Sequence, residues 1–122
     1  MRELTKAEEQ IMQILWTLDE AFVNDIIDKM PEPKPAYNTV STIVRILEKK
    51  GFVDHRAYGK THQYFPIISK TDYTRSFMKN FMGNYFGSSF REMVSFFARE
   101  DKMTVSEIET LMEDVKKELE NE

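Results

Sequence analysis

Residues 37–50 constrain the fold of this chain more than any other segment. Their apolar side chains recur at helical spacing on one side, at Val40, Ile43, Val44 and Leu47, with Ile46 beside them. Three prolines between residues 31 and 35 forbid helix before the segment, and Gly51 is the expected stop after it. The sequence therefore predicts an amphipathic helix over residues 37–50.

Two further helices are predicted before this one. Thr5 and Glu8 have the spacing of a capping box, in which the threonine side chain accepts from the backbone and the glutamate reaches back. An apolar stripe follows, so we expect a helix over residues 6–18. After a short turn at residues 19–21, a second stripe predicts a helix over residues 23–30.

A β-hairpin is predicted after the third helix. Residues 52–58 and 61–67 are strand-like, and Gly59-Lys60 forms the turn between them. Three helices and a hairpin are the element order of a winged helix-turn-helix domain, whose third helix enters the major groove of DNA. We therefore expect a mainly α fold with a small β-hairpin, and a winged-helix DNA-binding domain over residues 1–69.

The charge of the chain is unevenly distributed. The net charge is −4, but residues 34–62 carry six Lys/Arg against two Asp/Glu, a net +4. This basic segment covers the predicted third helix and hairpin, and its local charge matters to a polyanion because fields are screened over about 8–10 Å. Short polar side chains on the outer helix face suit base edges and phosphates, whereas exposed helix faces are usually richer in Lys and Glu.

The residues that we predict to contact DNA come from the helix and the hairpin. They are Asn38, Thr39, Ser41, Thr42, Arg45 and Lys49 in the helix, and Arg56, Lys60 and Thr61 in the hairpin. A solvated polar helix face and an ordinary solvated hairpin are the alternatives. A winged-helix module that binds proteins instead of DNA is another, and the basic segment argues against it.

The second half of the chain, residues 70–122, is predicted to be a helical dimerisation region. Helix is expected over residues 73–100 with a break near 83–89, and again after a second capping box at Thr104 and Glu107. This region is rich in aromatic side chains, and two or three helices cannot bury them all. We therefore expect a second copy of the chain to cover them. The predicted dimer contacts are Phe77, Phe81, Tyr85, Phe86, Phe90, Met93, Phe97, Ile108, Leu111, Met112 and Val115. A ligand pocket lined by rings is the alternative.

Several functions are disfavoured by what the sequence lacks. Without cysteine there is no disulfide, thiolate zinc site or thiol catalysis, and two histidines, His55 and His62, are too few for an imidazole metal site. We expect no metal, no cofactor and, without a nucleophile or phosphate-loop motif, no enzyme activity. No apolar run approaches the roughly 20 residues that span a bilayer, and the start lacks a signal peptide, so we expect a cytoplasmic protein without a membrane partner.

Five short motifs carry a family resemblance. They are Leu4-Thr5-Lys6-Ala7-Glu8, Ile14-Leu15-Trp16, Asn38-Thr39-Val40-Ser41-Thr42, Leu47-Glu48-Lys49-Lys50-Gly51-Phe52, and Tyr58-Gly59-Lys60 with Tyr64-Phe65-Pro66. At these residues the chain resembles the penicillinase-repressor family of winged-helix transcriptional regulators, which includes beta-lactamase repressors, methicillin-resistance regulators and copper-responsive repressors. The resemblance covers about residues 3–70, and Glu107-Ile108-Glu109-Thr110-Leu111 is similar to the last helix of the family.

The resemblance implies a homodimeric repressor that binds a palindromic operator in double-stranded DNA. Thr39 and Thr42 match the threonines of the family's recognition helix, and Tyr37 stands where the family usually has tryptophan, so we add it to the DNA contacts. Arg45 lies one residue before the usual family arginine.

Induction is where the sequence departs most from the family. Beta-lactam-responsive members are cleaved at an Asn-Phe bond, and the matching pair here is Phe96-Phe97, without asparagine. Copper-responsive members use a cysteine-rich tail, which this chain lacks. Neither signal is therefore assigned, and a sensor protease, a further partner that the resemblance implies, is not identified by the sequence.

Overall fold

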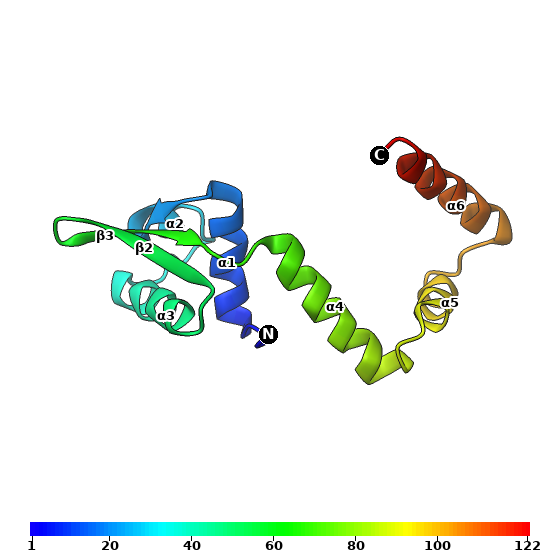
Figure 1. The fold of residues 1–122 in the computed structure, drawn as a ribbon, viewed down its shortest axis with the longest axis horizontal. Helices are drawn as coiled ribbons and strands as arrows, with labels where there is room; N and C mark the ends of the chain where they lie inside the picture. Colours follow the sequence, from blue (N-terminus) through cyan, green and yellow to red (C-terminus); the bar gives the residue numbers. More distant parts are fainter. The chain divides into compact units, whose positions relative to one another are not determined.

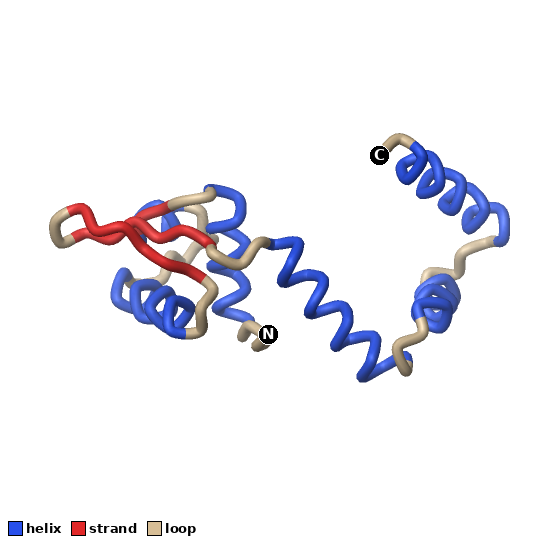
Figure 2. Tube along the Cα trace, viewed as in Figure 1, coloured by secondary structure: helices blue, strands red, loops and turns tan.

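The chain divides into two compact units. The computed structural model describes all of residues 1–122, and the units cover residues 1–77 and 78–122. In chain order the elements are α1 (Lys6–Leu18), β1 (Ala21–Phe22), α2 (Val23–Asp28), α3 (Tyr37–Lys49), β2 (Val53–Tyr58), β3 (Thr61–Pro66), α4 (Lys70–Phe86), α5 (Phe90–Glu100) and α6 (Val105–Glu120) (Figure 1). All strands lie in the first unit (Figure 2). The predicted class, mainly helical with a small β component, is confirmed.

The ends of the helices in the first unit are fixed by local interactions. The Thr5 hydroxyl accepts from the Glu8 amide at 3.2 Å, and the Glu8 carboxylate accepts from the Thr5 amide at 2.8 Å, so the predicted capping box is confirmed. The chain leaves α3 through Gly51 with φ +83°, a conformation that glycine adopts without steric cost. At the end of α2, the Lys34 ammonium donates to three carbonyl oxygens, those of Ile27, Asp28 and Met30.

The sheet has three antiparallel strands in the order β1-β3-β2. In β2 and β3, His55 pairs with Tyr64 and Ala57 with His62, so the predicted hairpin is confirmed. The prediction of a turn over residues 19–21 is wrong at Ala21, which pairs with Tyr64 and is buried. A two-residue strand is too short to show the alternation of polar and apolar residues by which strands are recognised.

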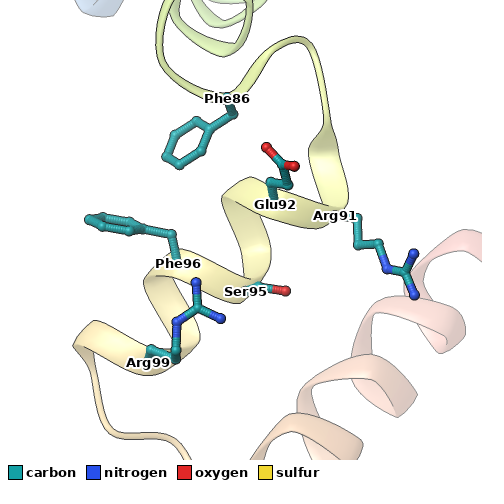
Figure 3. Close-up of a pocket in the computed structure, with 6 residues that line it drawn as sticks. All are labelled: Phe86, Arg91, Glu92, Ser95, Phe96 and Arg99. Atoms are coloured by element: carbon teal, nitrogen blue, oxygen red, sulfur yellow. The ribbon is translucent and has the colours of Figure 1, made fainter.

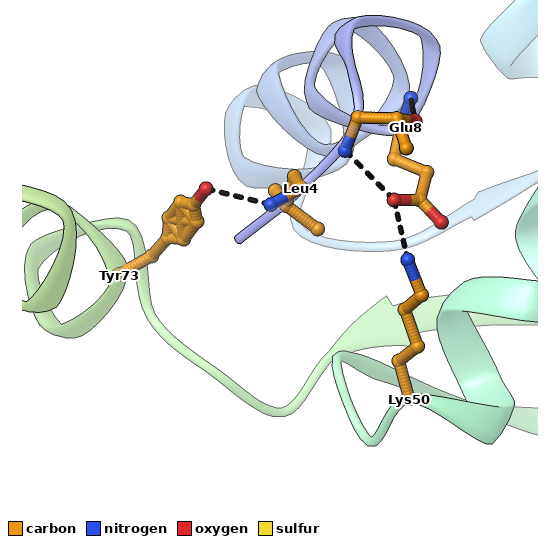
Figure 4. A network of polar contacts seen from close by, with 5 residues as sticks. Leu4, Glu8, Lys50 and Tyr73 are labelled. Atoms are coloured by element: carbon orange, nitrogen blue, oxygen red, sulfur yellow. Dashed lines mark hydrogen bonds and ion pairs between the residues drawn. The ribbon is translucent and has the colours of Figure 1, made fainter. Parts of the chain in front are cut away.

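One hydrophobic core holds the first unit together. Its fully buried side chains include Ile11, Met12, Leu15, Ile26, Val40, Val44, Leu47, Phe52 and Val53. Tyr73 of α4 joins this core, with its ring centroid 5.7 Å from that of Phe52 and its hydroxyl accepting from the Leu4 amide at 2.9 Å (Figure 4). The start of α4 therefore belongs to the packing of the first unit.

The second unit has no buried residue at all. Helix α4 continues through Gly83 to Phe86, and the chain turns over residues 87–89 before α5. Thr104 caps α6 by accepting from the Glu107 amide at 3.1 Å. None of the helices combines the length and apolar character that crossing a membrane requires. Residues 78–122 therefore form helices without forming a core of their own.

A buried ion pair joins α1 to the end of α3. The Glu8 carboxylate, in a residue only 4% exposed, accepts from the Lys50 ammonium at 2.8 Å as well as from the Thr5 amide (Figure 4). Burial alone would raise the pKa of Glu8, but the hydrogen bonds from Lys50 and Thr5, with the charge of Lys50, together hold it below its ordinary value. The charged form of Glu8 therefore stabilises the fold.

Replacing Glu8 by Gln should lower stability and change its dependence on pH. We expect Glu8→Gln to lower the free energy of unfolding at pH 7 by about 1–3 kcal/mol, below the full cost of breaking a buried pair because Lys50 reaches solvent. Because the folded pKa of Glu8 is lowered, its contribution is present above the unfolded pKa and is lost as pH falls through the folded value. Urea unfolding at several pH values measures both effects. The exposed neighbour Glu9→Gln is the control, and equal profiles for the two variants would contradict the prediction.

Candidate nucleic-acid interface

The polar face of α3 is exposed over most of its length. Asn38, Thr39, Thr42, Arg45 and Lys49 are all exposed, on the side opposite the buried Val40, Val44 and Leu47. Tyr37, the first residue of the helix, is 49% exposed. The Thr42 hydroxyl donates to the Asn38 carbonyl oxygen at 2.8 Å, which leaves its methyl group and oxygen lone pairs at the surface. This face offers donors, acceptors and positive charge to a ligand outside the protein.

Ser41 does not lie on this face. It is only 7% exposed, so the expectation that it shares the outer face with its polar neighbours is wrong. Position 41 lies between the two faces of the helix, because Val44 three residues later is buried whereas Arg45 four residues later is exposed. Serine is small enough to be accommodated at the edge of the core.

The two cations of the hairpin, Arg56 and Lys60, lie in different environments. Gly59 has φ +64° in the turn, which extends beyond the helices of the first unit (Figure 1), and the next two residues, Lys60 and Thr61, are exposed. Arg56 is held against the protein instead: its guanidinium lies 4.4 Å from the ring centroid of Phe65 and donates to the Glu20 carboxylate at 3.0 Å. The turn therefore presents Lys60 openly, whereas Arg56 already has an acidic partner.

Only part of the basic segment is available to a polyanion. Lys34 caps α2, and Lys50 and Arg56 pair with Glu8 and Glu20. Arg45, Lys49 and Lys60 form no ion pair and are exposed. These three cations lie on the outer face of α3 and at the hairpin turn, so the free positive charge is confined to these two elements.

Contacts between α3 and the hairpin fix these two elements relative to each other. Nδ1 of His55 in β2 lies 2.7 Å from a carboxylate oxygen of Glu48 in α3. Burial, followed by the charge of Glu48, raises the pKa of Tyr64 in β3, whereas Arg45 acts in the opposite direction. Neither spacing nor residue type indicates a contact between helix and strand, so the sequence does not predict that Glu48, His55 and Tyr64 belong to this arrangement.

The apolar surface of the second unit is extensive. Among the residues predicted to make dimer contacts, Tyr85, Phe90, Phe97, Leu111, Met112 and Val115 are between 44% and 73% exposed, and Phe77, at the end of the first unit, is 38% exposed. Phe81, Phe86, Met93 and Ile108 are half-buried. The rings of Phe86, Phe96 and Phe97 form a cluster with centroids 5.5–6.3 Å apart. An apolar area of this kind is typical of a protein interface.

A pocket also lies in the second unit. Its lining combines rings and charges, from Phe86, Arg91, Glu92, Ser95, Phe96 and Arg99 (Figure 3). The rings of Phe86 and Phe96 lie side by side, and Arg91 points away from them (Figure 3). Both rings belong to the cluster of Phe86, Phe96 and Phe97, and Phe86 and Phe97 are predicted dimer contacts, so this pocket is not separate from those contacts.

Comparison with known proteins agrees with the family resemblance. The family model described as "Penicillinase repressor" matches residues 4–117. The chain is 29% identical over 110 residues to the methicillin resistance regulatory protein MecI of Staphylococcus aureus (strain N315), covering 89% of each chain. It is 24% identical over 110 residues to the penicillinase repressor of Bacillus licheniformis, covering 89% of this chain and 86% of that protein.

One solved structure supports the assignment of the first unit. The solution structure of the DNA binding domain of the repressor BlaI superposes with a TM-score of 0.51 and 26% sequence identity. It covers 60% of this chain and 94% of that domain. The likeness confirms the winged-helix fold.

The contact between α3 and the hairpin can be tested through Tyr64. We expect Glu48→Gln to lower the pKa of Tyr64 by removing a nearby negative charge, and Arg45→Gln to raise it by removing an opposing positive one. NMR titration of tyrosine ring carbons follows each hydroxyl separately. A Tyr64 pKa that is insensitive to both substitutions would contradict this arrangement.

Proposed function

Because the chain belongs to the penicillinase repressor family, we propose that it is a transcriptional repressor that binds operator DNA as a homodimer. The observation that carries the proposal is the exposed polar face of α3, where Arg45 and Lys49 lie without acidic partners and Lys60 extends the positive charge onto the hairpin. The family is named for a repressor, in agreement with the prediction that the chain is not an enzyme. Uncompensated cations beside short polar side chains suit a duplex better than a protein partner.

The exposed residues divide into two kinds of contact. The side chains of Asn38, Thr39 and Thr42 are short, so they allow α3 to lie close to the base edges in the major groove. The threonine methyl groups can contact thymine. Arg45, Lys49 and Lys60 contact phosphates, and Tyr37 and Thr61 support them from the ends of the two elements. Arg56 must exchange Glu20 for a phosphate to take part. Ser41, being buried, is left out of the proposed surface.

A second copy of the chain covers the apolar surface of residues 77–122. The absence of any buried residue in the second unit supports this, because helices with one apolar stripe are stabilised mainly by packing. Two recognition helices then read two half-sites of one palindrome, about one helical turn of DNA apart or a multiple of it. Joining them raises the effective concentration of the second domain after the first has bound.

The sequence signal for the cleavage of beta-lactam-responsive family members is absent from this chain. Phe96-Phe97 lies inside α5 and lacks the asparagine of the family cleavage site. We therefore propose that this chain is not inactivated by cleavage there.

The DNA contact of α3 is tested by a charge placed on its outer face. We expect Thr42→Asp to weaken binding to the operator by about tenfold or more, because a carboxylate replaces a base contact and repels phosphates. Fluorescence anisotropy with the duplex upstream of the gene measures this. Thr17→Asp is a matched control, because the Thr17 hydroxyl donates to a carbonyl four residues back on α1 as Thr42 does on α3. Equal affinities for both variants and the wild type would rule out α3 as the reading helix.

The hairpin contact is tested by salt dependence. We expect Lys60→Ala to weaken binding to all duplexes and to reduce the slope of affinity against salt by roughly one charge. Lys29→Ala, which removes an exposed cation outside the basic segment, should leave the slope unchanged. A wild-type slope in the Lys60 variant would remove the hairpin from the interface.

Dimerisation is tested on α6. We expect Leu111→Asp to raise the dimer dissociation constant at least about tenfold, because it places a charge in an apolar interface. Thr110→Asp, on the opposite side of the same helix, should leave association unchanged. Sedimentation equilibrium distinguishes the two. A monomeric wild type, or equal association of both variants, would contradict the proposed dimer.

A further inference from the structure

The two carboxylates of the basic segment lie together beside a histidine. Residues 34–62 contain two acidic residues, Glu48 and Asp54. One oxygen of each and a ring nitrogen of His55 all lie within 4.8 Å of one another. Under the proposed function, two negative charges beside the free cations of this surface oppose DNA binding, and a cation bound between the two carboxylates and the imidazole would offset them.

We propose that Glu48, Asp54 and His55 form a binding site for a divalent transition-metal ion of the Zn²⁺ type. Imidazole nitrogen with carboxylate oxygen is a ligand set that suits zinc, and three protein ligands with water in the fourth position is a known coordination for it. Metal–ligand bonds of about 2.0–2.2 Å place ligand atoms roughly 3–3.5 Å apart, so small side-chain rotations suffice from the present 4.8 Å. Asp54 is exposed and can rotate, and Glu48 already lies 2.7 Å from Nδ1 of His55.

The ring of His55 is already held in position for this role. Its Nδ1 lies 2.7 Å from the Glu48 carboxylate, and the cation takes the place of the proton between these two atoms. The ring of His62 stacks on that of His55, with centroids 4.1 Å apart and planes 8° apart. Because a metal lies in the plane of the imidazole that binds it, two parallel rings cannot share one ion, so His62 is a positioning residue and not a ligand.

This site revises the expectation that the chain holds no metal. That expectation counted histidines alone, whereas here two carboxylates supply the other ligands. A bound cation also connects α3 to β2, the two elements of the proposed DNA interface. It offsets the two negative charges beside Arg45 and Lys49, and under the proposed function it should therefore strengthen DNA binding.

Calorimetric titration of the full chain with ZnCl₂, in the absence of DNA, tests the site separately from the proposed function. We expect one Zn²⁺ per chain, with affinity reduced at least about tenfold in His55→Gln and in Glu48→Gln. Glu20→Gln removes an exposed carboxylate outside the site and should bind like the wild type. Excess Mg²⁺, which prefers six oxygen ligands, should not displace the Zn²⁺.

A third variant, Asp54→Asn, should keep the fold intact, because asparagine retains the oxygen that accepts from the His55 amide. Zn²⁺ should raise the melting temperature of the wild type, and this rise should be smaller in Asp54→Asn. Absence of stoichiometric Zn²⁺ binding by the wild type would overturn the proposal. Binding that is unchanged in the His55 and Asp54 variants would overturn it as well, because the ion would then be bound by other residues of the chain.

Discussion

The buried ion pair between Glu8 and Lys50 is the interaction that ties the end of α3 to the start of α1. The Glu8 carboxylate completes the cap of α1 through the Thr5 amide and accepts from Lys50 just after the end of α3. One side chain therefore begins the first helix and holds the end of the third against it. Because the core side of α3 is fixed by Val40, Val44 and Leu47, its polar side is presented to solvent in a defined orientation. A rigid support of this kind is what precise positioning of a recognition surface requires.

Pairing within the first unit determines which cations near α3 and the hairpin remain free. Acidic partners neutralise Lys50 and Arg56, and carbonyl oxygens engage Lys34, so that Arg45, Lys49 and Lys60 remain available. The negative net charge of the chain thus coexists with a small positive surface on α3 and the hairpin. In the proposed dimer, the apolar residues of the second unit would bring two such surfaces to one duplex.

Much of the first unit could be predicted, because its signals are local. The capping box at Thr5, the prolines before Tyr37 and Gly51 after α3 mark helix ends through backbone chemistry that neighbouring residues determine. Strand β1 could not be predicted, since its two residues become a strand only by pairing with β3. The burial of Ser41 and the contact between Glu48 and His55 were missed for a related reason: both depend on how α3 packs against other elements, which residue type and spacing do not specify.

The proposed function requires this chain to recognise a specific DNA sequence with two copies of α3. The most direct test is fluorescence anisotropy of the full chain with the duplex upstream of its own gene and with a scrambled duplex, at two salt concentrations. We predict tighter binding to the upstream duplex at both concentrations, saturating at two chains per site. Equal and weak binding to both duplexes, with no sequence enriched from a random pool, would contradict the proposed function and favour a winged-helix module that binds proteins.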